Sequence, residues 1–142
     1  MWRACLVVSA FAVLAGCVTT PPGAEQITKT PAERLLAFQS PTDGDATLIV
    51  TRDVGYSGSA CRIAVFIDGK EVARLERGER AIFHVPSGQR VLGAWGTGRG
   101  LCGYQEGKNR NETDATVKPG QTRQFRAMVV PNLGPTINPS TL

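Results

Sequence analysis

Hydrophobic and polar residues alternate along most of the chain after residue 44. In the first such stretch, residues 46–52, Leu48 and Val50 fall on one face, and the other face holds Thr47, Ile49 and Thr51. A period of two is typical of a β-strand with one buried face. Stretches of this kind occupy six further segments: 61–67, 70–75, 80–85, 89–95, 112–117 and 122–130.

Turn-forming residues separate these stretches. Asp68-Gly69 is the preferred pair for a two-residue type I′ hairpin turn. This turn predicts two cross-strand pairs, Ile67 with Lys70 and Val65 with Val72. Residues 86–88 (Pro-Ser-Gly) are expected to turn the chain back along 89–95, with Val91 and Trp95 on one face. Residues 118–121 (Lys-Pro-Gly-Gln) are expected to close the last hairpin.

Seven short strands with no helix between them predict an all-β fold, a single antiparallel β-sandwich. The predicted sandwich covers residues 45–130. The chain has 142 residues, enough for one domain, and 42% of them are hydrophobic, enough to build its core. Residues 131–142 contain three prolines and are expected to form a loose tail.

The segment before the sandwich, residues 17–44, is predicted to be a tether with one short helix. Residues 18–29 are rich in Thr, Pro and Gly, a composition typical of flexible linkers. Residues 30–33 (Thr-Pro-Ala-Glu) look like a helix start, with a capping threonine, a proline at the first helical position and a glutamate that completes a capping box. Leu35 and Phe38 would dock this helix on the domain; a partner-binding helix is the alternative.

Residues 1–16 have the layout of an export signal. Arg3 supplies a positive charge, and residues 4–15 form an apolar run of signal-peptide length. The run is too short for a permanent membrane helix, which needs roughly 20 apolar residues. It ends in Leu14-Ala15-Gly16-Cys17, which resembles the lipobox of bacterial lipoproteins at all four positions. The resemblance implies a diacylglycerol on the Cys17 thiol, cleavage before it and acylation of the new amino terminus; cleavage without lipid is the alternative.

The residue after the lipidated cysteine influences sorting in bacteria with two membranes. Val18 stands at this position, and not the aspartate associated with retention in the inner membrane. The resemblance therefore implies the periplasmic face of the outer membrane. The inner membrane is the alternative.

The four cysteines divide into two pairs. Cys5 would leave with the signal and Cys17 would carry lipid. Cys61 and Cys102 would remain, an even number in an oxidising compartment, which predicts a disulfide bond. Free thiols are one alternative. A metal site is another, although neither cysteine has the C-x-x-C or H-x-x-C spacing of metal ligands; no metal or cofactor is expected.

The charge of the chain is mildly positive. The formal charge is +4, and removing residues 1–16 takes away one arginine and no acid, which leaves +3. This small, scattered excess indicates solubility, with weak attraction to anionic lipid headgroups or wall polymer as the alternative. Nucleic acid is not an expected partner, because the sequence has no basic helix or stripe.

The glycine-rich segment at residues 96–110 is the candidate binding loop, because long loops on a rigid sandwich often bind ligands. Five residues of this region suit an anionic or sugar-bearing ligand: Trp95 at the base of the loop, Arg99, Tyr104, Lys108 and Arg110. A dinucleotide-binding loop is excluded, since Leu101 stands where the fingerprint needs glycine. The alternative is that Trp95 fills the core and the glycines only permit the bend.

The Asp68-Gly69-Lys70 turn and the later Val85-Pro86-Ser87-Gly88 turn resemble those of an uncharacterised domain family found in small proteobacterial lipoproteins. The layout is also similar to PEGA-type and transthyretin-like sandwiches, which implies an immunoglobulin- or transthyretin-like fold. The family brings no established catalytic residues. His84, the single histidine, faces away from Phe83 and Val85 in its predicted strand, which indicates a surface residue and not a catalytic one.

The sequence therefore favours a non-enzymatic module of the cell envelope that binds another envelope protein or supports an assembly. A binder of cell-wall glycan or lipopolysaccharide through residues 96–110 is the second hypothesis. An inhibitor of an attacking lytic enzyme is the third.

Overall fold

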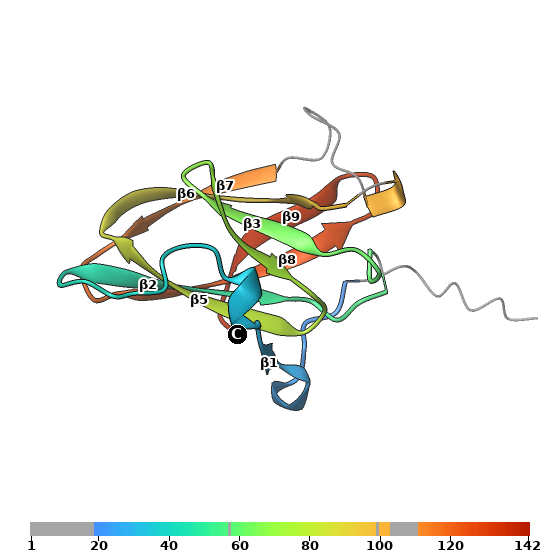
Figure 1. Ribbon diagram of the computed structural model, residues 1–142, viewed down its shortest axis with the longest axis horizontal. Helices are drawn as coiled ribbons and strands as arrows, with labels where there is room; N and C mark the ends of the chain where they lie inside the picture. The colour runs from blue at the N-terminus through green and yellow to red at the C-terminus, as the bar shows by residue number, and fades with distance from the viewer. Residues whose placement is uncertain (1–18, 57, 99, 103–110) are drawn as a thin grey trace, which may run out of the picture.

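The computed structural model describes residues 19–56, 58–98, 100–102 and 111–142, whose strands form two β-sheets that lie face to face (Figure 1). The larger sheet has the spatial order β1 (Thr28–Lys29), β5 (Glu79–Pro86), β2 (Asp45–Arg52), β8 (Thr122–Val130), β9 (Gly134–Ser140). The smaller sheet has the order β4 (Lys70–Leu75), β3 (Ile63–Ile67), β6 (Gly88–Gly96), β7 (Asn111–Val117). Three short 3-10 helices complete the described elements: η1 (Ala24–Gln26), η2 (Ala32–Arg34) and η3 (Gly100–Cys102). The fold is a β-sandwich.

One hydrophobic core lies between the two sheets. The alternating pattern of β2 places Leu48 and Val50 in it, as expected, and neither side chain is exposed to solvent. Phe83 of β5 and Phe125 of β8 extend the same layer. The smaller sheet contributes its own inward-facing side chains, among them Ile63, Val65, Ile67, Val72, Leu75 and Leu92. Burial of such apolar surface is the main driving force for folding, at roughly 25 cal/mol per Å².

All seven predicted strands are present, and the described residues contain two more, β1 and β9. The prediction of a loose C-terminal tail is wrong, because β9 pairs with β8 along its whole length. Pro135 and Pro139 are tolerated because β9 is the outer strand of its sheet, where a missing amide need not break a ladder. Ile137 of β9 is buried in the core, and this contact explains why the edge strand binds.

The sandwich is not purely antiparallel, contrary to expectation. β1 runs parallel to β5 and β2 runs parallel to β8, while the other strand pairs are antiparallel. β2 and β8 lie far apart in the sequence, so no turn dictates their relative direction. Core packing decides it: Val50 and Phe125 lie side by side, and both are buried.

The Asp68-Gly69 turn forms as predicted. Both residues have positive φ, 50° and 79°, as a type I′ turn requires. The first cross-strand pair next to the turn is the predicted one, but the second is shifted: Val65 lies opposite Ala73 and not Val72. A β-bulge causes the shift, and both Val72 and Ala73 are fully buried as a result.

Two turns that were expected to reverse the chain within one sheet instead carry it between the sheets. Residues 86–88 connect β5 in the larger sheet with β6 in the smaller one, and residues 118–121 connect β7 with β8 in the opposite direction. The same turn residues serve a hairpin and an inter-sheet connection, since both need only a tight reversal. The partner strands that are available on each side decide which one forms.

The segment that precedes the sandwich is not a flexible tether over its described residues. The Val54 amide donates to the Thr20 carbonyl oxygen at 2.9 Å, and the Thr28 amide donates to the Gly78 carbonyl oxygen at 3.0 Å. Gly78 is required at this contact, because its φ is 71° and a Cβ atom would lie 2.5 Å from the Gln26 carbonyl oxygen. The segment is therefore fitted against the edge of β5.

The predicted helix after Thr30 is reduced to η2, a single 3-10 turn. Thr30 does not cap it; its hydroxyl donates instead to the Arg80 carbonyl oxygen at 3.0 Å. Leu35 bridges to Ala73 of β4, and Leu35 and Phe38 pack on the core, so the docking takes place without the helix. A helix of two turns gains little by itself, and pairing with a strand edge satisfies the backbone better. Among the described residues, no helix has the length and apolar character to cross a membrane.

Candidate functional site

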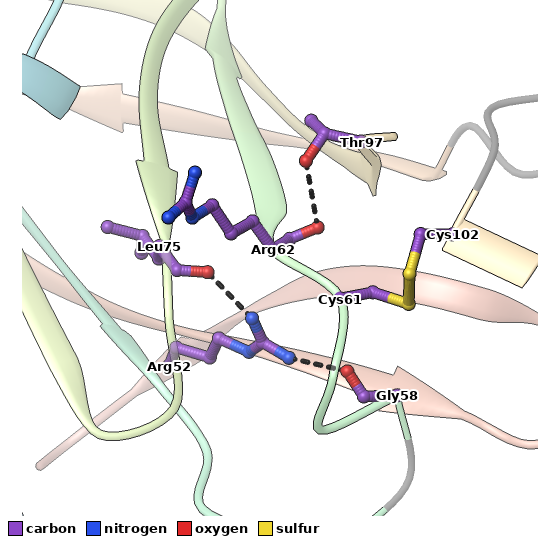
Figure 2. Close-up of a disulfide and its surroundings, with 7 residues drawn as sticks. All are labelled: Arg52, Gly58, Cys61, Arg62, Leu75, Thr97 and Cys102. Carbon is purple, nitrogen blue, oxygen red and sulfur yellow. Dashed lines mark hydrogen bonds between the residues drawn. A yellow bond between two sulfur atoms is a disulfide. The ribbon is translucent and has the colours of Figure 1, made fainter. Parts of the chain in front are cut away.

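Cys61 and Cys102 form the predicted disulfide, with the sulfur atoms 2.02 Å and the Cα atoms 5.3 Å apart. Cys61 precedes β3 and Cys102 ends η3, which follows β6. Because β3 and β6 are neighbours in the smaller sheet, the bond joins the segment before one strand to the segment after the other (Figure 2). It braces one end of the sandwich.

Trp95 does not fill the core between the sheets. Its ring stacks on Phe66 of β3, with the two planes inclined by 26°. Leu92 and Ala94 on the same strand point into the core and are fully buried. Val91, which the sequence places on the face of Trp95, is 36% exposed. That shared face is therefore the outer face of the smaller sheet.

The described part of the predicted binding loop lines an open groove of about 690 Å³ beside the disulfide. The groove is lined by Ser59, Ala60, Cys61, Arg62, Arg74, Glu76, Arg77, Thr97, Gly98 and Cys102. Three arginines line it against one glutamate, and Glu71 pairs with Arg74 beside it, so the groove has a small positive excess. The remaining residues proposed from the sequence lie outside the described part of the chain: Cys17, Arg99, Tyr104, Lys108 and Arg110.

Arg52, at the end of β2, holds one side of this groove in place (Figure 2). Its buried guanidinium donates to the Leu75 carbonyl oxygen at 2.6 Å and to the Gly58 carbonyl oxygen at 2.8 Å. Burial, with a smaller contribution from the charge of Arg77, lowers the pKa of Arg52 to about 10. Arg52 is therefore charged at neutral pH and joins the segment before β3 to the end of β4.

Arg62 and Glu76 form an ion pair on the groove wall. The Arg62 Nε donates to the Glu76 carboxylate at 2.8 Å, and this hydrogen bond holds the pKa of Glu76 below its usual value. The side chains are 51% and 50% exposed, so the pair is open to solvent and adds little stability. The Arg62 carbonyl oxygen also accepts hydrogen bonds from the amide and the hydroxyl of Thr97, each at 3.3 Å (Figure 2).

Arg77 connects the groove to the N-terminal segment. Its Nε donates to the Val54 carbonyl oxygen at 3.0 Å, and its guanidinium carbon lies 5.5 Å from the centroid of the Tyr56 ring. The Val54 amide in turn donates to the Thr20 carbonyl oxygen. Arg77, Tyr56, Val54 and Thr20 therefore form one continuous surface.

The groove arginines are absent from the set of site residues that the sequence suggested. Residues 71–80 contain three arginines and three glutamates, a charge density equally typical of a solvated turn. Arg62 comes near Arg74 only because β3 pairs with β4, which places Ala64 opposite Arg74. The alternating charges of residues 71–80 were the signal in the sequence, and they do not distinguish the wall of a binding groove from a solvated turn.

Guanidinium groups bind phosphate and carboxylate groups through paired N–H donors, so the groove is suited to an anion. The described residues hold no group of three histidine, cysteine or carboxylate side chains placed to bind a metal ion. No protein-family model matches the chain, and no curated protein is detectably similar to it.

Proposed function

We propose that this protein is a lipoprotein of the bacterial cell envelope, anchored through lipid on Cys17, whose β-sandwich is a non-enzymatic binding module. The anchor would hold the sandwich at the periplasmic face of the outer membrane. The proposal includes an immunoglobulin- or transthyretin-like relationship for the sandwich and a place in the lipoprotein group that its turns resemble.

The complete lipobox, Leu14-Ala15-Gly16-Cys17, carries the proposal. It follows the apolar run 4–15, and Cys17 is the one residue of the tetrapeptide whose side chain can form a thioether.

The arginine groove supports the binding part of the proposal. It is open and positive, and it is framed by the disulfide and by the buried Arg52. A framed site loses less conformational entropy when a ligand binds than a flexible one does. The expected ligand or partner surface is anionic.

The lipid anchor is tested by substitution of Cys17 in cells grown with labelled palmitate. The wild-type protein should take up label and sediment with membranes, and Cys17→Ser should do neither. Cys5→Ser is the matched control, because Cys5 lies in the export signal and would be removed. Label that persists in Cys17→Ser contradicts the proposal.

Binding of lipopolysaccharide or cell-wall glycan is the second candidate function. The observation that favours it is the charge of the groove, since these polymers carry phosphate and carboxylate groups. In-cell crosslinking separates the candidates. Capture of a membrane protein favours an envelope assembly, capture of lipopolysaccharide or a muropeptide favours the second candidate, and capture of a soluble lytic enzyme favours an inhibitor.

A further inference from the structure

The lipid of Cys17 would be attached very close to the folded domain; this inference rests on the anchor proposed above. Thr20 is hydrogen-bonded to Val54, and Pro22 is buried. Three residues of chain span at most about 11 Å, so the Cα atom of Cys17 can lie no farther than that from the Cα atom of Thr20. The headgroup layer of one leaflet is itself roughly 5–7 Å thick. A domain held at this distance touches the headgroups.

The same hydrogen bond shows which end of the sandwich touches them. Thr20 lies at the end where β2, β4, β6 and β8 finish and where β3, β7 and β9 begin. We call this the anchor end. In Figure 1 it carries the green loop between β2 and β3, the orange η3 and the red turn between β8 and β9. The arginine groove opens at this end.

The side chains of the anchor end suit a lipid surface. Tyr56 is 85% exposed beneath the guanidinium of Arg77, and Leu133 in the β8–β9 turn is 52% exposed. Tyrosine rings favour the level of the headgroups, where one side of the ring is apolar and the hydroxyl is wet. Arginine binds phosphate oxygens through two parallel N–H groups, and the exposed pairs of Arg62 with Glu76 and of Arg74 with Glu71 are weak enough to be exchanged for such contacts. Both residue types occur where the chain approaches Cys17.

The two ends of the sandwich also differ in charge. The groove at the anchor end contains three arginines and one glutamate. The turns and strand ends at the opposite end contain three aspartates and three basic residues, which balance: Asp43, Asp45, Asp68, Lys70, Lys118 and Arg90, which pairs with Asp68. Anionic membrane surfaces attract basic residues that lie within a Debye length. The charge distribution therefore favours the same orientation as the position of Thr20.

We infer that the anchor end is a membrane-docking surface, on which Arg62, Arg74 and Arg77 bind the phosphates of lipid headgroups and Tyr56 lies at headgroup level. The occupant of the groove is the headgroup layer of the membrane that holds Cys17. Lipid attachment and a basic surface are two separate signals, and together they fix the domain in one orientation.

The orientation is tested with the full-length lipidated protein, reconstituted in vesicles of phosphatidylethanolamine and phosphatidylglycerol whose acyl chains carry bromine near the glycerol. Tyr56→Trp introduces an indole at the anchor end and Gln89→Trp introduces one at the opposite end. The signal of Trp95, common to both, is subtracted with the wild type. The indole introduced at position 56 should be quenched, because it lies at headgroup level next to the bromine atoms, and the one at position 89 should not be quenched.

A second pair of variants tests the arginines in the Tyr56→Trp background. Arg62→Gln with Arg74→Gln removes two positive charges from the groove, and Lys70→Gln with Lys118→Gln removes two from the opposite end. Each basic residue near an anionic surface contributes roughly a fivefold preference, so removing the arginine pair should lower the ratio of docked to undocked protein by about 25-fold at low salt. The lysine pair should leave the quenching unchanged.

Mass spectrometry of each preparation separates the two proposals. Protein that lacks acyl chains on Cys17 overturns the anchor, and the orientation with it. Lipidated protein in which position 56 is not quenched, or is quenched no more than position 89, overturns the orientation alone. Equal effects of the arginine and lysine pairs overturn the phosphate contacts.

Discussion

Charged side chains at the strand ends hold the loops of this sandwich in place. Arg52 donates to two backbone carbonyl groups, and Arg126 donates to both carboxylate oxygens of Asp53, at 2.9 and 2.6 Å. A buried guanidinium is tolerated only where its N–H groups find acceptors. The Arg52 guanidinium finds these acceptors in the carbonyl oxygens of Leu75 and Gly58, which are hydrogen-bonded by it in turn. Arg52 therefore positions the groove without lining it.

Replacement of Arg52 should destabilise the fold. Arg52→Met leaves two carbonyl groups without their donor, and the free energy of unfolding should fall by about 2–4 kcal/mol. Because the pKa of Arg52 is about 10, the side chain is charged in both the folded and the unfolded chain between pH 6 and pH 8, and the loss should be equal at these two values. Urea denaturation at each pH measures it.

Arg62→Met is the control for this substitution. Its side chain is 51% exposed and its ion pair is on the surface, so its effect should stay within about 0.5 kcal/mol. Equal losses for Arg52→Met and Arg62→Met would show that the buried hydrogen bonds are unimportant.

The N-terminal segment is an element of the sandwich, and one ion pair reinforces its backbone attachment. Glu79, at the start of β5, is buried, and its carboxylate accepts hydrogen bonds from two nitrogens of Arg34 in η2 and from the Glu76 amide at 2.7 Å. The hydrogen bond to Glu79 raises the pKa of Arg34. Through this pair, η2 is fastened to the turn between β4 and β5.

Glu79→Ala should therefore loosen β1 and η2 together. Removing one partner of a largely buried pair leaves Arg34 with the half-exposed Glu76, 3.9 Å away, as a weaker partner, and the unfolding free energy should fall by about 3 kcal/mol. Hydrogen exchange of residues 28–36 should accelerate more than exchange of the core strands. Glu71→Ala, which breaks the more exposed pair with Arg74, is the matched control and should change little. Unchanged exchange at residues 28–36 would refute this attachment.

At the scale of the whole molecule, the disulfide and the core contribute in different ways. The core joins the two sheets through buried side chains that come from strands along most of the described chain. The disulfide braces only one end, between residues 41 positions apart. A cross-link stabilises mainly by restricting the unfolded chain. Its contribution to the free energy of unfolding therefore depends on the number of residues between the two cysteines and not on the contacts of the sulfur atoms.

Cys61→Ala with Cys102→Ala should fold and lose about 4 kcal/mol of stability, by the chain-entropy relation for a loop of this length. Denaturation of the double variant and of the wild type under reducing conditions should give similar midpoints. If wild-type protein taken from cells has two thiols that alkylate without reduction, the bond does not form in the cell.

The local features of the fold could be predicted from the sequence. The seven central strands follow from period-two alternation, and the Asp68-Gly69 turn follows from the positive φ that both of its positions require. The disulfide follows from a count of cysteines. Each of these depends on residues close together in the chain or on composition, so no knowledge of distant partners is needed.

The pairing of distant segments was decided only by the tertiary structure. The parallel pairing of β2 with β8, the crossing at residues 118–121 and the attachment of the N-terminal segment each depend on which strand edge is free after the others have paired. The arginine groove has the same origin, because Arg62 and Arg77 come from different segments and meet only when β3 pairs with β4. Burial of the core selects one set of these pairings, and burial is a property of the assembled sheets and not of any local stretch of sequence.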